Sequence, residues 1–238
     1  MAQGQRNFQI VFGVVVVVGA VFLASKLIGG KPVSIPANPV VTITDTAGFR
    51  GYEVGDSMAP IEIAEYAAYT CPFCALFDAV WWPDLKSRLI DTRIARWRFR
   101  DYPLGHVGEH RWSWEAALAA ACANDQNKFW PVKEAIFMRQ GDWSASSNAI
   151  PVFAEIIKAA GLEETKWTEC MKSSKYAGRI QASYDEGTKL GVNSTPTFLI
   201  GDRLYTLDRV RSADAFVRLV DSLSKVAKPS VPATPTKP

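Results

Sequence analysis

The sequence predicts an α/β domain in which a block of helices interrupts a β-sheet. Two observations support this fold class. Segments rich in β-branched and aromatic residues lie on both sides of the middle of the chain, at 59–69, 93–102 and 197–205. Between them, residues 109–187 carry apolar side chains at helical spacing. The predicted order is therefore β-α-β, then the helical block, then β-β-α.

The amino-acid composition is that of a globular protein, and it narrows the possible functions. With 48% hydrophobic and 21% charged residues among 238, whole-chain disorder and collagen-like structure are excluded. A net charge of +3 gives no reason to expect a nucleic-acid partner. The two histidines, His106 and His110, are not close in sequence to a cysteine pair, so a Cys/His zinc module is not indicated. We expect no metal site and no cofactor.

The N-terminal segment, residues 1–28, is predicted to be a signal anchor or a signal peptide. Ile10 to Ala24 contains fifteen residues without a polar group. If Lys26 reaches the membrane surface, Ile10 to Ile28 provides 19 residues, close to the roughly 20 that span a bilayer. Cleavage is disfavoured because Leu23-Ala24-Ser25 lacks a small residue at its first position. A buried strand would fit the valines but not a position before a Pro-rich linker.

Two further segments lack the composition of a folded domain. Residues 29–45 contain three prolines and two glycines and are predicted to form an extended linker. Residues 228–238 contain four prolines and are predicted to be a disordered tail. The remaining span, 46–227, is long enough for one domain with its own hydrophobic core.

The first part of the sheet is predicted by three consecutive segments. Residues 59–69 are a strand candidate, 76–89 a helix interrupted by Pro83, and 93–102 a second strand. This second strand alternates apolar and basic residues, which is typical of a half-solvated strand. We expect its solvated face to consist of the basic residues, and the opposite face of the aromatic ones: Arg96, Arg98 and Arg100 against Trp97 and Phe99.

The remaining elements follow from helical and alternating patterns. The helical block contains apolar faces around residues 109–126, 129–136, 152–160, 163–171 and 176–190. Gly161 and Gly191 follow two of these segments as expected C-caps. Two short strands, 197–200 and 204–205, are then expected around a Gly201-Asp202 turn. An amphipathic helix at 213–226 ends the domain.

The motif Cys71-Pro72-Phe73-Cys74 directly follows the first predicted strand and begins a helix. At this spacing the two sulfurs face one another on the first helical turn and can close a small ring. Free backbone N–H groups and the helix dipole favour the thiolate of Cys71, and Pro72 suits the first turn. A C-x-x-C pair alone also fits half a zinc site, an iron–sulfur fragment or a structural bridge. The strand-then-helix context favours redox chemistry.

At this point the sequence resembles a known family. The segment IEIAEYAAYTCPFC resembles the active-site strand and helix of the thioredoxin superfamily, specifically its DsbA-like branch. Further stretches match that branch in order: DYPLGH, EAALAAACANDQNKFW, WTECMKSSKYAGRIQASYDEGTKLGVNSTPTF and the C-terminal amphipathic helix. The resemblance covers about residues 46–227 and implies a thioredoxin-like fold with a helical insert at about 104–187.

The resemblance also implies roles for residues outside the C-x-x-C motif. Pro196 matches the cis-proline of the family, and Thr195 would offer backbone groups to an extended substrate peptide. Glu65 matches an acidic position beneath the active-site helix. If Glu65 is buried, we expect it to have a raised pKa and to exchange a proton with Cys74; the alternative is a surface glutamate.

The other two cysteines, Cys122 and Cys170, both fall in the insert. Some DsbA-like proteins carry a second cysteine pair there, so the resemblance favours a structural disulfide. Two buried free thiols are the alternative. The active-site motif itself differs from the CPHC sequence of the best-known oxidase, because Phe73 replaces histidine. Phenylalanine supplies neither charge nor donors to the thiolate, so we expect a higher pKa for Cys71 and a less oxidising couple than in a CPHC enzyme.

The resulting hypothesis is a monomeric, membrane-anchored thiol–disulfide oxidoreductase without a cofactor. Its expected substrates are reduced secreted or periplasmic proteins, and a DsbB- or VKOR-type membrane protein would reoxidise it. The catalytic domain would lie in the periplasm, on the bacterial inner membrane or free if the N-terminal segment is cleaved. Alternatives are a disulfide isomerase or reductase, and a non-catalytic chaperone that binds a metal or cofactor through Cys71 and Cys74. Residues 29–45 are too short for an isomerase dimerisation domain.

Overall fold

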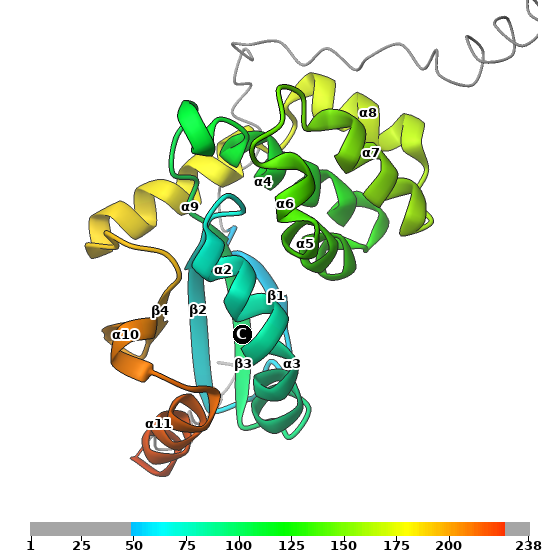
Figure 1. Cartoon of the computed structure of the whole chain (residues 1–238). Coiled ribbons are helices and arrows are strands. Elements are labelled where there is room, and N and C mark those ends of the chain that lie inside the picture. The colour runs from blue at the N-terminus through cyan, green and yellow to red at the C-terminus, as the bar shows by residue number, and fades with distance from the viewer. Residues whose placement is uncertain (1–48, 227–238) are drawn as a thin grey trace, which may run out of the picture. The chain divides into compact units, whose positions relative to one another are not determined.

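The computed structural model describes residues 49–226 (Figure 1). The expected anchor or signal peptide at 1–28, the linker at 29–45 and the tail at 228–238 lie outside the described residues. Among residues 49–226, no helix combines the length and the apolar composition that crossing a membrane requires.

The sheet has five strands in the order β1-β3-β2-β4-β5. Strands β2 and β3 pair in parallel, and the other neighbouring pairs are antiparallel. This matches the predicted β-α-β and β-β-α units, and β1 is a short addition at the edge that the sequence pattern did not predict. The strands are β1 (Tyr52–Val54), β2 (Ile61–Ala67), β3 (Ala95–Asp101), β4 (Thr197–Ile200) and β5 (Arg203–Thr206).

The helix between β2 and β3 begins at Pro72, as the position of the C-x-x-C motif predicts, four residues before the start at Leu76 that the apolar pattern predicts, and it continues to Ile90. It alternates α-type and wider π-type turns: α2 (Pro72–Leu76), η1 (Phe77–Trp81), α3 (Trp82–Leu85) and η2 (Lys86–Ile90). Pro83 therefore does not interrupt the helix. It lies in the first turn of α3, where a missing backbone donor is tolerated, directly after a π-type turn.

The inserted helices lie between β3 and β4 and form a block beside the sheet (Figure 1). The block consists of η3 (Gly108–His110), α4 (Ser113–Ala123), η4 (Asn124–Gln126), α5 (Phe129–Met138), α6 (Gln140–Trp143), α7 (Ile150–Ala159) and α8 (Glu164–Ser173). The next helix, α9 (Ala177–Leu190), leads back to the sheet and ends at Gly191, which has a positive φ of 85°. Two helices follow β5: α10 (Leu207–Val210) and α11 (Ala213–Val226).

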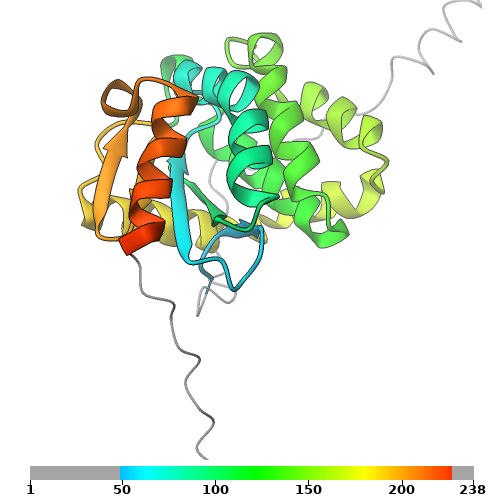
Figure 2. The same ribbon diagram turned by 90° about the horizontal axis from the view of Figure 1, so that it is seen from below.

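Helices cover both faces of the sheet (Figure 2). On one face, Phe77 and Leu85 from the 72–90 helix and Phe216 from α11 share a core with Ile63 and Trp97. On the other face, α9 packs its Tyr184 near Tyr66 and Tyr102. Gly187 permits this close approach, since a Cβ atom there would lie 2.8 Å from the Tyr102 ring and 2.9 Å from the Tyr66 ring.

The expected solvated arginine face of β3 is wrong. Arg98 and Arg100 are only 9% and 1% exposed, because α9 covers this face of the sheet. Arg100 pairs with Glu186 of α9, and Arg98 Nη2 lies 3.0 Å from the carboxylate of Glu62. Buried guanidinium groups are stable here because each is matched by a carboxylate. Only Arg96, which also binds Glu62, stays partly exposed.

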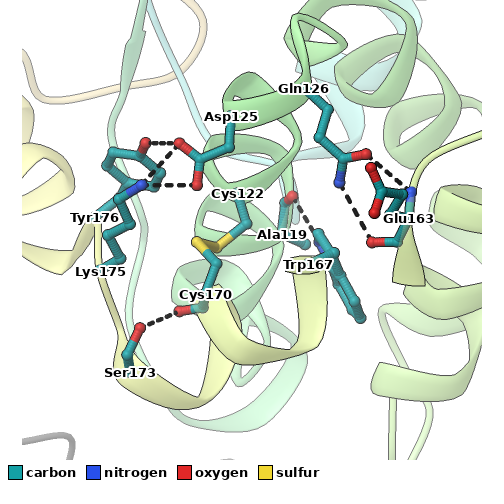
Figure 3. Close-up of a disulfide and its surroundings, with 10 residues drawn as sticks. All are labelled: Ala119, Cys122, Asp125, Gln126, Glu163, Trp167, Cys170, Ser173, Lys175 and Tyr176. Atoms are coloured by element: carbon teal, nitrogen blue, oxygen red, sulfur yellow. Dashed lines mark hydrogen bonds and ion pairs between the residues drawn. A yellow bond between two sulfur atoms is a disulfide. The ribbon is translucent and has the colours of Figure 1, made fainter. Parts of the chain in front are cut away.

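Cys122 of α4 and Cys170 of α8 form a disulfide, with their Cα atoms 5.7 Å apart (Figure 3). Hydrogen bonds tie the same segments together on both sides of the bridge. Gln126 and the backbone of Glu163 exchange two bonds, and Trp167 Nε1 donates to the carbonyl of Ala119 at 3.1 Å. Asp125 binds Lys175 and Tyr176. The alternative of two free thiols does not apply in this structure.

Candidate active site

Cys71 lies at the point where the chain leaves β2 and enters the 72–90 helix. Its backbone is extended and caps the helix, while Cys74 lies one turn further on. The backbone N–H groups of Cys74 and Ala75 donate to the carbonyl of Cys71 at 3.1 and 3.2 Å. Both cysteines are unbonded thiols, and their exposed fractions are 5% for Cys71 and 0% for Cys74. Both thiols are buried, and of the two only Cys71 retains any exposed surface.

The loop before β4 lies against Cys71. The Thr195–Pro196 peptide bond is cis, which is the geometry that the family resemblance implies for Pro196. The Cys71 thiol donates to the carbonyl of Thr195, with an Sγ–O distance of 3.2 Å. A cleft of about 480 Å³ adjoins this loop and is lined in part by Asn193, Ser194 and Thr197. The loop therefore presents the backbone carbonyl of Thr195 to the Cys71 sulfur.

The two thiols have opposite acidities. The pKa of Cys71 is lowered to about 6, first by a hydrogen bond from the Cys74 side chain and then, against the effect of burial, by bonds from the side chain of Thr195 and from the backbone of Cys74 and Phe73. The pKa of Cys74 is raised well above its usual value, mainly because the thiol is completely buried. At neutral pH, Cys71 is the nucleophile and leaving group, whereas Cys74 must be deprotonated before it reacts.

Glu65 is 1% exposed and lies on the face of β2 that packs beneath the active-site helix. The indole Nε1 of Trp97 donates to its carboxylate at 2.9 Å. Burial raises the pKa of Glu65 to about 7; Lys133 opposes this shift and Asp78 adds to it. The charge of Glu65 in turn raises the pKa of Cys74. Glu65 is thus not a surface residue, and its role in proton transfer stays a prediction.

Phe73, the residue that departs from the CPHC motif, is 63% exposed. Leu76 and Val80 follow it along the helix and are also more than half exposed, at 53% and 59%. These three side chains give the helix beside Cys71 an exposed apolar edge. Such an edge suits contact with unfolded protein segments, whose apolar side chains are accessible.

The structure adds active-site residues from the insert that were not singled out in the sequence. The side chain of Gln140 donates to the carbonyls of Tyr69 and Cys71, at 2.6 and 3.0 Å, and so fixes the segment that carries the nucleophile. No pattern marks Gln140 in the sequence. Lys133 forms a buried ion pair with Asp78 of η1. The sequence indicates that Lys133 is buried, because residue 133 falls on the same apolar helical face as Phe129 and Ile136.

No metal site accompanies the cysteines in the part of the chain that the structure describes. Within residues 49–226, no three His, Cys, Asp or Glu side chains come together in an arrangement that could hold an ion. The arrangement at Cys71 and Cys74 can perform dithiol–disulfide exchange, because it combines an acidic thiol that retains a small exposed surface, a buried partner thiol and a carboxyl group with a pKa near neutrality.

Comparisons with known proteins agree with this site. Residues 50–222 match the family model described as thioredoxin. A protein of Rickettsia conorii, provisionally named a protein-disulfide oxidoreductase, is 23% identical over 182 residues, which is 75% of this chain and 64% of the relative. The chain therefore spans less than two thirds of that relative's length.

Solved structures show the same fold. Oxidised BdbD from Bacillus subtilis superposes with a TM-score of 0.64 at 20% identity, covering 73% of this chain and 92% of BdbD. The α-DsbA1 protein of Wolbachia pipientis superposes with a TM-score of 0.62 at 25% identity, covering 74% of this chain and 91% of α-DsbA1. The mixed sheet with its helical insert is therefore the DsbA-like variant of the fold.

Proposed function

The chain belongs to the thioredoxin family, and we propose that it is an enzyme that exchanges disulfides with protein substrates through Cys71 and Cys74. The observation that carries this proposal is the difference between the two thiols. Cys71 has a lowered pKa and a small exposed surface, while Cys74 has a raised pKa and no exposed surface. This difference gives each sulfur a separate step in a two-step exchange.

In the oxidising direction, the reaction begins with a Cys71–Cys74 disulfide. A substrate thiolate attacks Cys71 Sγ, the ring opens, and Cys74 leaves and takes up a proton, for which the buried carboxyl of Glu65 is the candidate donor. A second substrate thiolate then attacks the substrate sulfur of the mixed disulfide. Cys71 leaves as a thiolate, which its lowered pKa favours. The substrate loses two electrons, and the enzyme disulfide gains them and becomes the dithiol.

Substrate binding is supported by two features beside Cys71. The loop at Thr195 and Pro196 offers backbone groups on which an extended peptide can pair as a short added strand. The exposed edge of Phe73, Leu76 and Val80 can contact apolar side chains of the same peptide. Neither feature selects one sequence, which suits an enzyme that acts on many unfolded proteins with reduced cysteines.

We place this activity outside the cytoplasm, in the bacterial periplasm or an equivalent compartment. The Cys122–Cys170 bridge supports this, because structural disulfides persist in oxidising compartments and are rare in the cytosol. The apolar segment at 1–28 would anchor the chain to the inner membrane, or be removed as a signal peptide. A DsbB- or VKOR-type membrane protein would accept the electrons from the reduced dithiol, and the enzyme would act as a monomer.

The decisive experiment is oxidation of a peptide dithiol by the stoichiometrically oxidised full-length protein. We expect the wild type to oxidise one peptide per enzyme, and Cys71→Ser to oxidise none. The matched control is Cys122→Ser/Cys170→Ser, which removes two cysteines and should retain exchange. Oxidation that persists in Cys71→Ser would overturn the proposal.

Two further assays separate the alternatives. Faster refolding of a scrambled substrate than of a reduced one would favour an isomerase. Tight zinc binding by the reduced protein, lost in Cys74→Ser and unaccompanied by exchange, would favour a thiolate metal chaperone. Zinc binding is disfavoured by Pro196, because the cis-proline loop occupies the space beside Cys71 Sγ where further metal ligands would have to lie.

A further inference from the structure

The exchange reaction assigns no role to Lys133, a buried lysine behind the active site. Lys133 belongs to the insert helix α5 and has no exposed surface. Its Nζ forms an ion pair with Asp78 of η1, one turn after Cys74 on the active-site helix. Removing two charges from water is costly even when they are paired, so this pair is not needed for stability alone.

The surroundings of Lys133 Nζ are aromatic. The nitrogen lies 5.3 Å from the ring centroids of Trp82, Phe99 and Phe137, and 5.6 Å from that of Trp130. These rings stabilise the cation through their faces and exclude water from it. An apolar side chain of the same length would fill the same space, so packing does not require a charge at this position.

The ion pair lies close to Glu65. Lys133 Nζ is 5.3 Å from the ring of Phe99, which is the register partner of Glu65 across β2 and β3, and Asp78 follows Cys74 by one helical turn. Lys133 lowers the pKa of Glu65, Asp78 raises it, and Glu65 in turn raises the pKa of Cys74. The titratable groups coupled to Glu65 are Cys74 from α2, Asp78 from η1, Lys133 from α5 and Tyr69, which follows β2. From β4, the residue paired with Glu65 is the uncharged Phe198. From β3, Glu65 receives the neutral donor Trp97. A further carboxylate on α5, Glu134, acts on Asp78 and accepts a hydrogen bond from Trp82.

We propose that the Asp78–Lys133 ion pair is a positioning device that links the helical insert to the proton chemistry of Cys74. The insert supplies the cation and the active-site helix supplies the anion, and together they set the pH at which Glu65 becomes able to accept the Cys74 proton. This inference rests on the proposed function and adds positioning residues to it. The charges touch neither the substrate nor the reacting sulfurs.

The affected step is the resolution of the mixed disulfide during reoxidation. The Cys74 thiol gives its proton to the Glu65 carboxylate, and the Cys74 thiolate attacks Cys71 Sγ. The Cys71–Cys74 bond forms as the bond between Cys71 and the partner sulfur breaks, and the partner leaves as a thiolate with the electron pair. The enzyme dithiol is oxidised and the partner disulfide is reduced, so no other oxidant is required.

The test measures how fast the full-length reduced protein resolves its mixed disulfide with glutathione after mixing with excess glutathione disulfide. Samples are acid-quenched, and the mixed and ring-closed forms are counted by mass spectrometry from pH 5 to 9. We expect the wild-type resolution rate to rise with a midpoint near the Glu65 pKa of about 7. Lys133→Met should move this midpoint up by about one pH unit, and Asp78→Asn should move it down.

Three controls make the test specific. Lys128→Met changes an exposed lysine just before α5 and should leave the midpoint unchanged. In a Glu65→Gln background, neither Lys133→Met nor Asp78→Asn should move it, whereas a general loosening of the fold would act in both backgrounds. Circular dichroism checks folding, and if Lys133→Met does not fold, the Asp78→Asn midpoint alone decides.

Shifts in the same direction for the two variants, or no shift, would overturn the inference while leaving the exchange activity intact. An Asp78→Asn midpoint at or above the wild-type value would do the same. Failure of the proposed function would look different: the wild-type protein would form no mixed disulfide at Cys71, and there would be no resolution step to measure.

Discussion

The two cysteine pairs of this protein are equally buried, yet the structure gives them opposite chemistry. Cys71 and Cys170 are both 5% exposed, and Cys74 and Cys122 are 0% and 1% exposed. The pair in the sheet domain consists of free thiols three residues apart at a helix start, and the pair in the insert is bridged across 48 residues. Burial alone therefore does not separate a reactive cysteine from a structural one.

The polar groups around each pair make the difference. Cys71 receives hydrogen bonds from backbone groups and from the side chains of Cys74 and Thr195, which together stabilise its thiolate. Cys122 and Cys170 are instead surrounded by bonds that join α4 and η4 to α8 and its N-cap, such as those between Gln126 and Glu163 (Figure 3). The groups around Cys71 lower the energy of its thiolate. The groups around Cys122 and Cys170 hold two helices together, and the two sulfurs are bonded to each other.

The largest expected effect comes from opening the insert bridge. Cys122→Ser/Cys170→Ser should lower the free energy of unfolding by about 4 kcal/mol, because the bridge closes a long loop and restricts the unfolded chain. Urea titration followed by far-UV circular dichroism measures this change. Cys71→Ser/Cys74→Ser is the matched control, since those thiols are unbonded, and it should change stability by far less. Equal losses in both variants would contradict the division into a reactive and a structural pair.

The elements of the sheet domain were largely predictable because their patterns are local. The last helix was predicted at 213–226, and α11 has those bounds, since an amphipathic period defines both ends. The strands β4 and β5 and their turn also follow from local residues. Strand β1 has three residues and exists only through its pairing with β3, so no periodicity indicates it.

What failed in the prediction depends on contacts distant in sequence. Arg98 and Arg100 alternate with aromatic residues as a solvated face would, but α9 returns over that face and places Glu186 beside them. In the site, the motif identifies Cys71 and Cys74, whereas Gln140 reaches the Cys71 carbonyl from 69 residues away. Local patterns show which residues can react; the fold determines which residues tune them.

A second, smaller effect should come from the carboxyl group beneath the reactive pair. Glu65→Gln should slow the resolution step by about 10²-fold at pH 7, because it removes the acceptor for the Cys74 proton. The difference in resolution rate between Glu65→Gln and the wild type should become smaller at high pH, where Cys74 ionises without a carboxylate to accept its proton. The same quench assay measures it, and Glu62→Gln, three residues earlier on β2 and bound to Arg96, is the control. A rate equal to that of the wild type would remove Glu65 from the mechanism.

The same substitution should change how stability depends on pH. The folded carboxyl of Glu65 holds its proton up to about pH 7, whereas the unfolded chain loses it near pH 4.5. The unfolded state therefore binds fewer protons between these values, and Glu65 makes the wild type lose stability as the pH rises from about 4.5 to 7. Glu65→Gln should lack this loss, so its urea midpoint should exceed that of the wild type most clearly above pH 7. If the urea midpoint of Glu65→Gln exceeded that of the wild type by the same amount at every pH, Glu65 would not be protonated in the folded state.

The smallest effect tests how finely the reactive pair is tuned. Phe73 contributes its backbone N–H to Cys71 but no charge, and its side chain is 63% exposed. Phe73→His keeps the backbone bond and adds a donor, so the pKa of Cys71 should fall by about one unit. Ultraviolet absorbance of the thiolate measures this change, and Phe73→Leu is the control that should leave the pKa unchanged.

The consequence for the redox couple follows from the same stabilisation. A thiolate stabilised by about 1.4 kcal/mol makes the dithiol form more stable and raises the reduction potential by about 30 mV, so Phe73→His should be the stronger oxidant. Equilibration with glutathione gives the potential of each variant. Phe73→His should leave the Cys122–Cys170 disulfide unchanged. No residue of the CPFC segment contributes to the hydrogen bonds of Gln126 with Glu163 or of Trp167 with Ala119. If Phe73→His moved the pKa but not the potential, then Phe73 would also act on the oxidised form, and the thiolate environment alone would not set the direction of exchange.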